Sequence, residues 1–203
     1  MDVEDEDPLV GEDFSETVLA GKRWRGRRFE GCDFSDADLR GLVTERCEFT
    51  ECDFTRADLG QTDHRGTALR GCVFVRAMLS GARLRGCSLL GSQFTDCRLR
   101  PISITDSDLS LVSLGGIDLR ETDLSGLRLR EANLVSADLR RAVLRGADLS
   151  GARMNGVDLR DADLRDARLD PGDLRTARVD GARVDLGTGI GFARAHGLLV
   201  DLG

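Results

Sequence analysis

The sequence predicts an elongated all-β solenoid in which the chain winds around a square, and three observations support this prediction. First, one apolar residue recurs at every fifth position from Phe14 to Val184, without an insertion. Second, a small residue stands two positions before most of these apolar residues. A fixed internal repeat of this kind determines the architecture of a chain. Third, five phenylalanines follow one another at intervals of twenty residues: Phe14, Phe34, Phe54, Phe74 and Phe94.

The five-residue spacing fits neither of the common regular structures. An amphipathic helix places apolar residues every three or four positions, and a half-buried strand places them every second position. Of the 35 positions in the register, only Thr44 and His64 are not apolar. We call this the central position, and we call the position two residues before it the small position, which is usually Ala, Cys, Ser or Thr. One large and one small inward side chain per five residues predict that each unit forms one side of the square.

The phenylalanine interval predicts four units per turn. Residues twenty positions apart then lie directly above one another, and aromatic rings stack on aromatic rings. The 35 units correspond to nearly nine turns. A strand spacing of about 4.8 Å predicts a rod about 40 Å long. Because each turn of a solenoid contacts only its neighbours, the core is a thin column along the axis.

This pattern resembles that of the pentapeptide-repeat family, whose repeat is usually written A(D/N)LXX. The stretch "REANLVSADLRRAVLRGADLSGAR", residues 130–153, illustrates the resemblance. The family folds as a right-handed quadrilateral β-helix, and the resemblance implies the same fold here. The residues after the last repeat predict a short C-terminal helix. We expect an acidic tail over residues 1–10 that is disordered, a β-helix over residues 11–186, and a capping and dimerisation segment over residues 187–203.

The segment after the last repeat, "TGIGFARAHGLLVDLG", has a different character. Thr188 is predicted to cap a short helix that runs through Ala195, with Gly197 as its stop. Two interpretations of the apolar residues here remain open: they cap the last turn of the rod, or they also join two rods in a twofold dimer. The candidate interface residues are Ile190, Phe192, Leu198, Leu199 and Val200.

No catalytic, cofactor or metal site is expected. All six cysteines occupy the small position, where a free thiol serves as a small apolar side chain, and the close Cys/His pairs of a zinc site do not occur. His64 interrupts the central register, either as an inward polar residue with a hydrogen-bond partner or as a local outward kink. No phosphate-binding glycine motif occurs. We therefore expect a protein that is not an enzyme and whose surface carries its function.

The formal net charge of −7 is unevenly distributed. The five acids before residue 8 contribute −5, residues 9–100 carry +1, and residues 101–203 carry −3. The basic stretch "GKRWRGRRF" is interpreted as protection of an exposed edge or as a partner of the acidic tail. It is not interpreted as a nucleic-acid site, because an acidic protein lacks the usual electrostatic footprint. No apolar run is long enough for a signal peptide or a membrane span, and reduced cysteines fit a cytoplasmic protein.

Within the pentapeptide-repeat family, the chain resembles the mycobacterial fluoroquinolone-resistance proteins of the MfpA type. The resemblance spans residues 42–199 and includes "TERCEFTECDF", "HRGTAL", "LGGIDLRETDL" and "GFARAHGL". It implies a homodimer joined head to head through the C-terminal segments, which imitates duplex DNA and binds DNA gyrase in place of DNA. Such a dimer would modulate supercoiling and protect against fluoroquinolones, without direct nucleic-acid or membrane binding. The competing hypothesis is a scaffold or adaptor rod that binds another protein and does not contact a topoisomerase.

The resemblance also implies that acids of the second half of the chain face gyrase. One observation opposes this, because one column of the predicted square carries three aspartates and the next column carries three arginines, so that formal charge largely cancels. A DNA mimic needs unpaired negative charge to meet the lysines and arginines of its partner. The arginines are Arg120, Arg140 and Arg160. The candidate gyrase-facing acids are Asp106, Asp108, Asp118, Glu121, Asp123, Glu131, Asp138, Asp148, Asp158, Asp161, Asp163 and Asp166.

Overall fold

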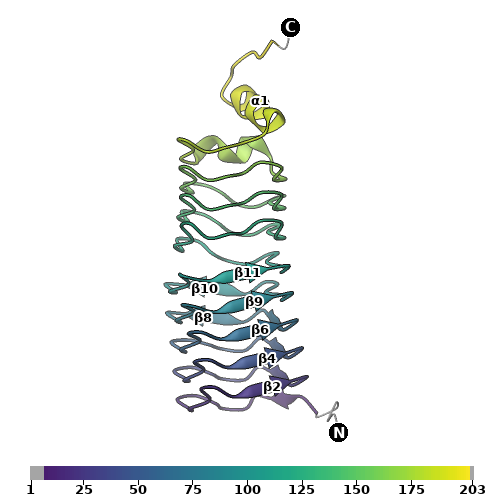
Figure 1. Cartoon of the computed structure of the whole chain (residues 1–203), viewed down its shortest axis with the longest axis vertical. Coiled ribbons are helices and arrows are strands. Elements are labelled where there is room, and N and C mark those ends of the chain that lie inside the picture. The colour runs from purple at the N-terminus through teal and green to yellow at the C-terminus, as the bar shows by residue number, and fades with distance from the viewer. Residues whose placement is uncertain (1–6, 202–203) are drawn as a thin grey trace.

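The computed structural model describes residues 7–201, which form one long rod with the N-terminal and C-terminal segments at opposite ends (Figure 1). The predicted fold class is confirmed: the chain is a right-handed quadrilateral β-helix followed by a short helix. Residues 1–6, most of the predicted disordered tail, lie outside the described residues.

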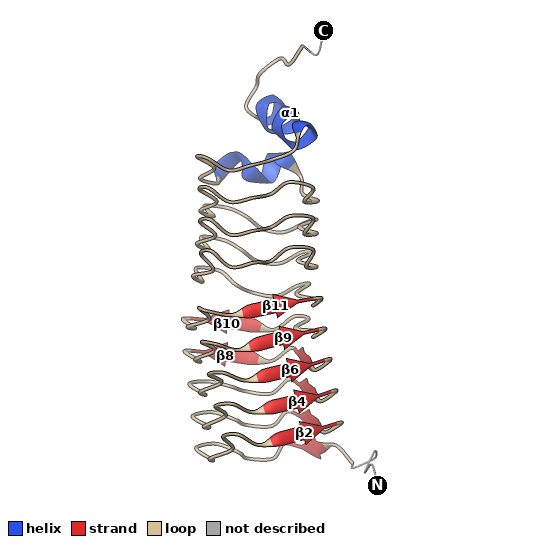
Figure 2. Ribbon diagram, in the orientation of Figure 1, coloured by secondary structure: helices blue, strands red, loops and turns tan. Residues whose placement is uncertain are grey.

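Wherever residues of the rod form a bridge, the two partners are twenty positions apart, so one turn contains four five-residue units. The bridges run from Asp13 with Asp33 in the first turn to Asp163 with Arg183 in the last. In the first half of the rod they lengthen into short strands (Figure 2). The strands are β1 (Leu9–Val10), β2 (Arg23–Arg25), β3 (Arg28–Glu30), β4 (Val43–Glu45), β5 (Glu48–Thr50), β6 (Asp63–Arg65), β7 (Ala68–Arg70), β8 (Val73–Val75), β9 (Arg83–Arg85), β10 (Gln93–Thr95) and β11 (Ser103–Thr105).

The strands form three parallel sheets, one on each of three sides. The strand orders are β1-β3-β5-β7, β10-β8 and β11-β9-β6-β4-β2. Strand β1 corrects one predicted boundary, because Leu9 already pairs with Phe29. The solenoid therefore begins two residues before residue 11.

The corners of the square are tight turns with a recurrent backbone conformation. In many units the carbonyl oxygen of the central residue accepts a hydrogen bond from the N–H three residues on, as Phe34 does from Ala37 at 3.2 Å. We call the second residue after the central one the corner residue. From Gly11 to Asp166, every corner residue except Pro101 has a positive φ. This conformation is typical of a type II turn and favours glycine, which explains why glycine is frequent at this position.

The central side chains form a continuous apolar core along the axis. The predicted phenylalanine column is confirmed: successive rings from Phe14 to Phe94 have centroids 4.5–5.1 Å apart and planes within 9° of parallel. Phe29 and Phe49 stack in the same way at 4.8 Å. The six cysteines are free, and their thiols lie against backbone carbonyls, as Cys32 Sγ does at 3.2 Å from Leu9 O.

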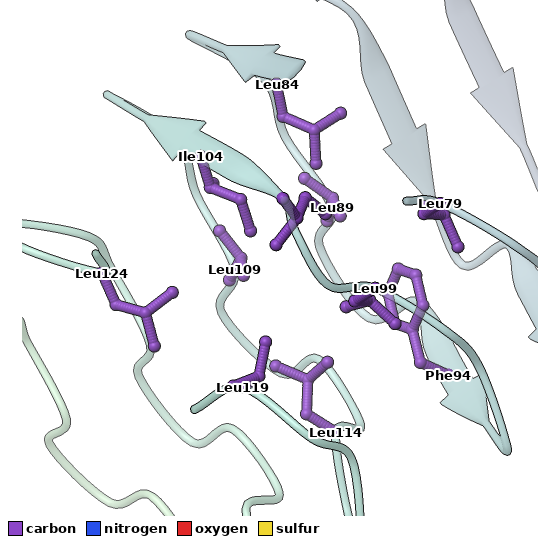
Figure 3. Close-up of a pocket in the computed structure, with 11 residues that line it drawn as sticks. Leu79, Leu84, Leu89, Phe94, Leu99, Ile104, Leu109, Leu114, Leu119 and Leu124 are labelled. Atoms are coloured by element: carbon purple, nitrogen blue, oxygen red, sulfur yellow. The ribbon is translucent and has the colours of Figure 1, made fainter. Parts of the chain in front are cut away.

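The hydrogen-bonded ladder is interrupted on two of the four sides near the middle of the rod. Among the described residues, no bridge joins Arg98 to Asp118 or Ser103 to Asp123, while the other two sides continue without a break. The Arg100 guanidinium spans this level, with ion pairs to Asp118 at 3.5 Å and to Glu121 at 3.4 Å. The core here contains an apolar void lined by leucine, isoleucine and phenylalanine side chains (Figure 3).

Two helical segments close the C-terminal end of the rod. The 3-10 helix η1 (Pro171–Thr176) replaces one side of the square while Leu174 stays buried in the central register. Helix α1 (Leu186–Ala195) packs on η1 so closely that a Cβ on Gly191 would lie 2.6 Å from Pro171 Cγ. The predicted cap is wrong by one turn, because Asp185 is the N-cap and accepts a hydrogen bond from the Thr188 N–H.

Candidate interaction surfaces

Seven of the twelve predicted gyrase-facing acids have a structural role in the turns. Each precedes a central residue, and its carboxylate accepts a hydrogen bond of 2.9–3.3 Å from the backbone N–H two residues on. This contact is the local reason why the repeat contains Asp before Leu, since aspartate side chains bond readily to nearby backbone donors. The seven turn acids are Asp108, Asp118, Asp123, Asp138, Asp148, Asp158 and Asp163.

The side that carries Asp118, Asp138 and Asp158 is neutral. Each of these carboxylates pairs with the arginine two residues on at 2.6–2.7 Å. Longer contacts connect successive turns, such as Arg120 Nε to Asp138 Oδ2 at 3.5 Å. The hydrogen bonds from Arg120 lower the pKa of Asp118 to about 2. The predicted cancellation of charge on this side is therefore confirmed, and these three acids are poorly suited to meet a cationic partner.

The other five predicted acids are corner residues, and they are exposed. Asp106, Glu121, Glu131, Asp161 and Asp166 have φ values between 53° and 62°. Within residues 7–201, only Glu121 of these five forms an ion pair, with Arg100 and Arg141. A residue other than glycine in this conformation has a steric cost of about 1 kcal/mol or more. Acids therefore stand where glycine would be more stable, and four of the five form no ion pair with the described residues.

The acids are not spread evenly around the rod. In the second half they occupy three sides, while the fourth side, residues 112–116, 132–136 and 152–156, contains none. We define the acidic side as residues 121–126, 141–146 and 161–166, and we include Asp106 because it lies on one of the two corner columns that bound them. It contains six acids and three arginines, a formal charge of −3. Its acids are Asp106, Glu121, Asp123, Asp161, Asp163 and Asp166. Glu131, Asp108 and Asp148 lie on the next side.

The C-terminal end of the rod exposes apolar side chains. Leu198 is 61% exposed and Leu199 is completely exposed, whereas Ile190, Phe192 and Val200 are half-buried. Phe192 packs against the apolar core, so the predicted interface residues divide into a cap and an exposed patch. Leu186, which sequence reasoning missed, is 77% exposed and adds to this patch. Its position in the first turn of α1 could not be inferred while the helix was expected to begin at Thr188.

The off-pattern central residues form a buried polar cluster. His64 is 2% exposed, and its Nδ1 shares a hydrogen bond of 2.7 Å with Thr44 Oγ1, which in turn shares one of 2.8 Å with Thr67 Oγ1. Of the two interpretations of His64, the inward polar residue with a partner is the one observed. Burial lowers the pKa of His64 to about 4. The imidazole is therefore neutral at physiological pH, and its role is to fill the core.

This buried histidine predicts a pH-dependent stability. Because the pKa is about 4 in the folded state and ordinarily about 6.5, the unfolded chain takes up the proton first as the pH falls. The full stability is present above pH 6.5, and about 3 kcal/mol is lost progressively between pH 6.5 and 4. Urea unfolding across this range checks the loss. In the variant His64→Leu the dependence should flatten, and an unchanged dependence in that variant would contradict this assignment.

The described part of the chain offers little for other chemistry. No group of three or more His, Cys, Asp or Glu residues there could hold a metal ion, and no buried side-chain nitrogen or oxygen atom lacks a hydrogen-bond partner. The void in the middle of the rod is lined only by apolar side chains. Within the same residues, no helix is long and apolar enough to cross a membrane.

Comparison with protein families gives a direct match. A family described as "Pentapeptide repeats (8 copies)" matches residues 28–63, 107–146 and 142–181, which is more than half of the chain. A second, described as "Pentapeptide repeat region", matches residues 47–124. Together these matches cover the rod from β3 to the level of η1.

Known proteins with detectable similarity include one from a mycobacterium. The chain is 52% identical over 43 residues to the pentapeptide repeat protein MfpA of Mycobacterium tuberculosis (strain ATCC 25618 / H37Rv). The aligned segment covers 21% of this chain and 24% of MfpA, so the match spans about a quarter of that protein.

Similar folds are found among solved structures. QnrB1, described as a plasmid-mediated fluoroquinolone resistance protein, superposes with a TM-score of 0.82 in a trypsin-treated variant form, with 24% sequence identity over 96% of this chain and 97% of QnrB1. Full-length QnrB1 gives the same TM-score at 23% identity, over 94% of this chain and 97% of that one. The likeness extends over almost the whole rod and concerns its fold.

Proposed function

Because the chain belongs to the pentapeptide-repeat family, we propose that its rod is a DNA-mimicking binder of DNA gyrase. In this proposal a homodimer in the cytoplasm occupies the DNA-binding surface of gyrase, modulates supercoiling and protects the enzyme from fluoroquinolones. Two similar proteins support it: the pentapeptide repeat protein MfpA by sequence, and QnrB1, described as a fluoroquinolone resistance protein, by fold. The protein acts through its surface and not as an enzyme.

The observation that carries the proposal is the position of the unpaired acids. Asp106, Asp161 and Asp166 lie on the two corner columns that bound the acidic side, in a backbone conformation that favours glycine. Because these carboxylates form no ion pair within residues 7–201, their charge is available to a cationic partner. The occurrence of acids at strained positions supports a functional reason for them. The neutral side with Asp118, Asp138 and Asp158 would contribute shape and rigidity to the complex.

The exposed apolar patch at the C-terminal end supports the dimer. Leu186, Leu198 and Leu199 lie at the end of the rod, where a twofold axis would bury them against the same residues of a second copy. Two rods of about 40 Å end to end match about 25 base pairs at 3.4 Å each. This arrangement also brings the acidic sides of the two copies together near the centre of the dimer.

Gyrase assays with purified proteins test the proposal. Increasing amounts of the protein should inhibit DNA supercoiling and reduce the cleaved DNA that accumulates with a fluoroquinolone, and excess duplex DNA should relieve both effects. Both reactions proceeding unchanged at low salt, where charge contacts are strongest, would sink the proposal.

The alternative function is that of a scaffold or adaptor rod without topoisomerase contact. The neutral side favours this alternative, because Asp–Arg ion pairs stabilise the rod without giving that side a net charge. This alternative predicts that the protein binds its partner equally well with and without DNA, and that changes of the corner acids leave binding unaffected.

A further inference from the structure

The first half of the rod carries a positively charged side that the proposed function does not use. The five-stranded sheet of β2, β4, β6, β9 and β11 forms this side, and the residues that flank each central residue point outward. Five of them are arginines and two are acids, a formal charge of +3 in a protein of net charge −7. A surface that replaces DNA must be negative, so this side lies outside the proposed gyrase contact. We call it the arginine face; its charged residues are Arg23, Arg25, Glu45, Asp63, Arg65, Arg83 and Arg85.

On this face the arginine side chains are more exposed to solvent than the acidic side chains. The Asp63 side chain is only 12% exposed, whereas those of Arg65 and Arg85, both paired with it, are 51% and 50% exposed. The distances are 2.8 Å from Arg65 Nη2 and 3.3 Å from Arg85 Nη2 to Asp63 Oδ2. One buried carboxylate therefore holds two guanidinium groups on adjacent strands and leaves one positive charge uncompensated.

The remaining charges on the face show the same difference in exposure. Glu45 pairs with Arg25 at 2.8 Å, and the glutamate side chain is 35% exposed against 70% for the arginine. Arg83 is exposed and forms no ion pair with any of residues 7–201. A partner approaching this side therefore meets guanidinium groups before it meets carboxylates.

We propose that the arginine face is a docking surface for an extended, carboxylate-rich segment of another protein. Guanidinium groups bind carboxylates through paired N–H donors, and fixed guanidinium groups lose less side-chain entropy on binding. Five strands at about 4.8 Å span roughly 19 Å, which an extended segment of about six residues covers.

The charges around the face favour such a segment over duplex DNA. The face is one side of the square, and acids lie beyond it, with Asp106 on the corner after β11 and Glu48 on the outward surface of β5. The acidic side then continues along the same side of the rod towards the C-terminus. A duplex would extend over these acids, and like charge opposes such a contact. A short acidic segment ends before it reaches them.

Binding of a fluorescently labelled hexaglutamate peptide, measured by anisotropy with the full-length protein, tests this proposal. Binding is expected at low salt and should weaken as the ionic strength rises. The double variant Arg23→Glu with Arg83→Glu should weaken it by about tenfold or more, because it replaces two attractive charges with repulsive ones. Neither arginine forms an ion pair with any of residues 7–201, so the fold should tolerate the change. The matched control, Arg98→Glu with Arg153→Glu, makes the same change of net charge at exposed residues outside the face.

Three outcomes would overturn the proposal. These are absence of peptide binding at low salt, equal loss in the face variant and in the control, and tighter binding of a short DNA duplex than of the peptide to the same face. The last outcome would assign the face to nucleic acid. None of these outcomes depends on gyrase, so this proposal and the proposed function succeed or fail separately.

Discussion

Replacement of Asp106, Asp161 and Asp166 together by glycine is expected to remove most of the inhibition of gyrase while leaving the rod at least as stable as before. All three have a positive φ, which glycine adopts without steric cost, and none forms an ion pair within residues 7–201. The free energy of unfolding should therefore stay at the parent value or rise by about 1 kcal/mol. The concentration for half-inhibition of supercoiling should rise about 10- to 100-fold, because the partner's cations lose their counterparts.

The chain offers a matched control for this variant. Glu16, Glu51 and Asp96 are also exposed corner residues with a positive φ, and they lie in the first half of the rod, away from the acidic side. Their joint replacement by glycine makes the same change in charge and in backbone preference. Inhibition should be retained in this control. Equal inhibition by both triple variants would mean that the corner acids do not contact gyrase.

Substitution of Leu198 and Leu199 by glutamate is expected to separate the proposed dimer. Both side chains are exposed at the C-terminal end, so the fold of a single rod does not depend on them. The mass measured by light scattering should fall to that of one chain, 22.1 kDa. Half-inhibition of supercoiling should then require about 100-fold more protein. In a dimer, binding of one rod keeps the other rod close to the enzyme, and this raises the affinity.

Exposed apolar residues at the opposite end provide the control for the dimer. Val10 and Val18 are 60% and 74% exposed, and their joint replacement by glutamate should leave both the mass and the inhibition unchanged. If the Leu198 and Leu199 variant keeps the mass of a dimer, the contact between copies lies elsewhere on the rod. If it is a monomer with full inhibition, the dimer is not needed for function.

Most of the fold could be predicted because the five-residue register contains 35 consecutive positions without an insertion. The phenylalanine interval also predicted the four-sided turn, since only residues in vertical register can stack as Phe54 and Phe74 do at 4.9 Å. The break between Arg98 and Asp118 could not be predicted, because the register runs through it without a gap. The 3-10 helix at Pro171 escaped notice for the same reason, as Leu174 keeps its place in the register.

The sequence was less informative about which acids are available for binding. It placed Asp138 and Arg140 side by side and so predicted neutral charge there, and the structure confirms this pairing. It did not show that the turn acids bind the backbone while the corner acids have a positive φ, because both properties belong to the folded turn. The signal was nonetheless present, since Asp161 and Asp166 occupy a position that is often glycine elsewhere in the repeat. An acid at a glycine position is a better pointer to function than an acid within the repeat consensus.

Competition between this protein and DNA for gyrase tests the central claim most directly. Labelled duplex DNA bound to gyrase is titrated with the protein at several salt concentrations, and the displaced DNA is measured. The account predicts complete displacement with simple competition, which weakens steeply as the ionic strength rises and requires the corner acids. A stable complex that contains gyrase, DNA and the protein together, with unchanged affinity for each, would contradict it.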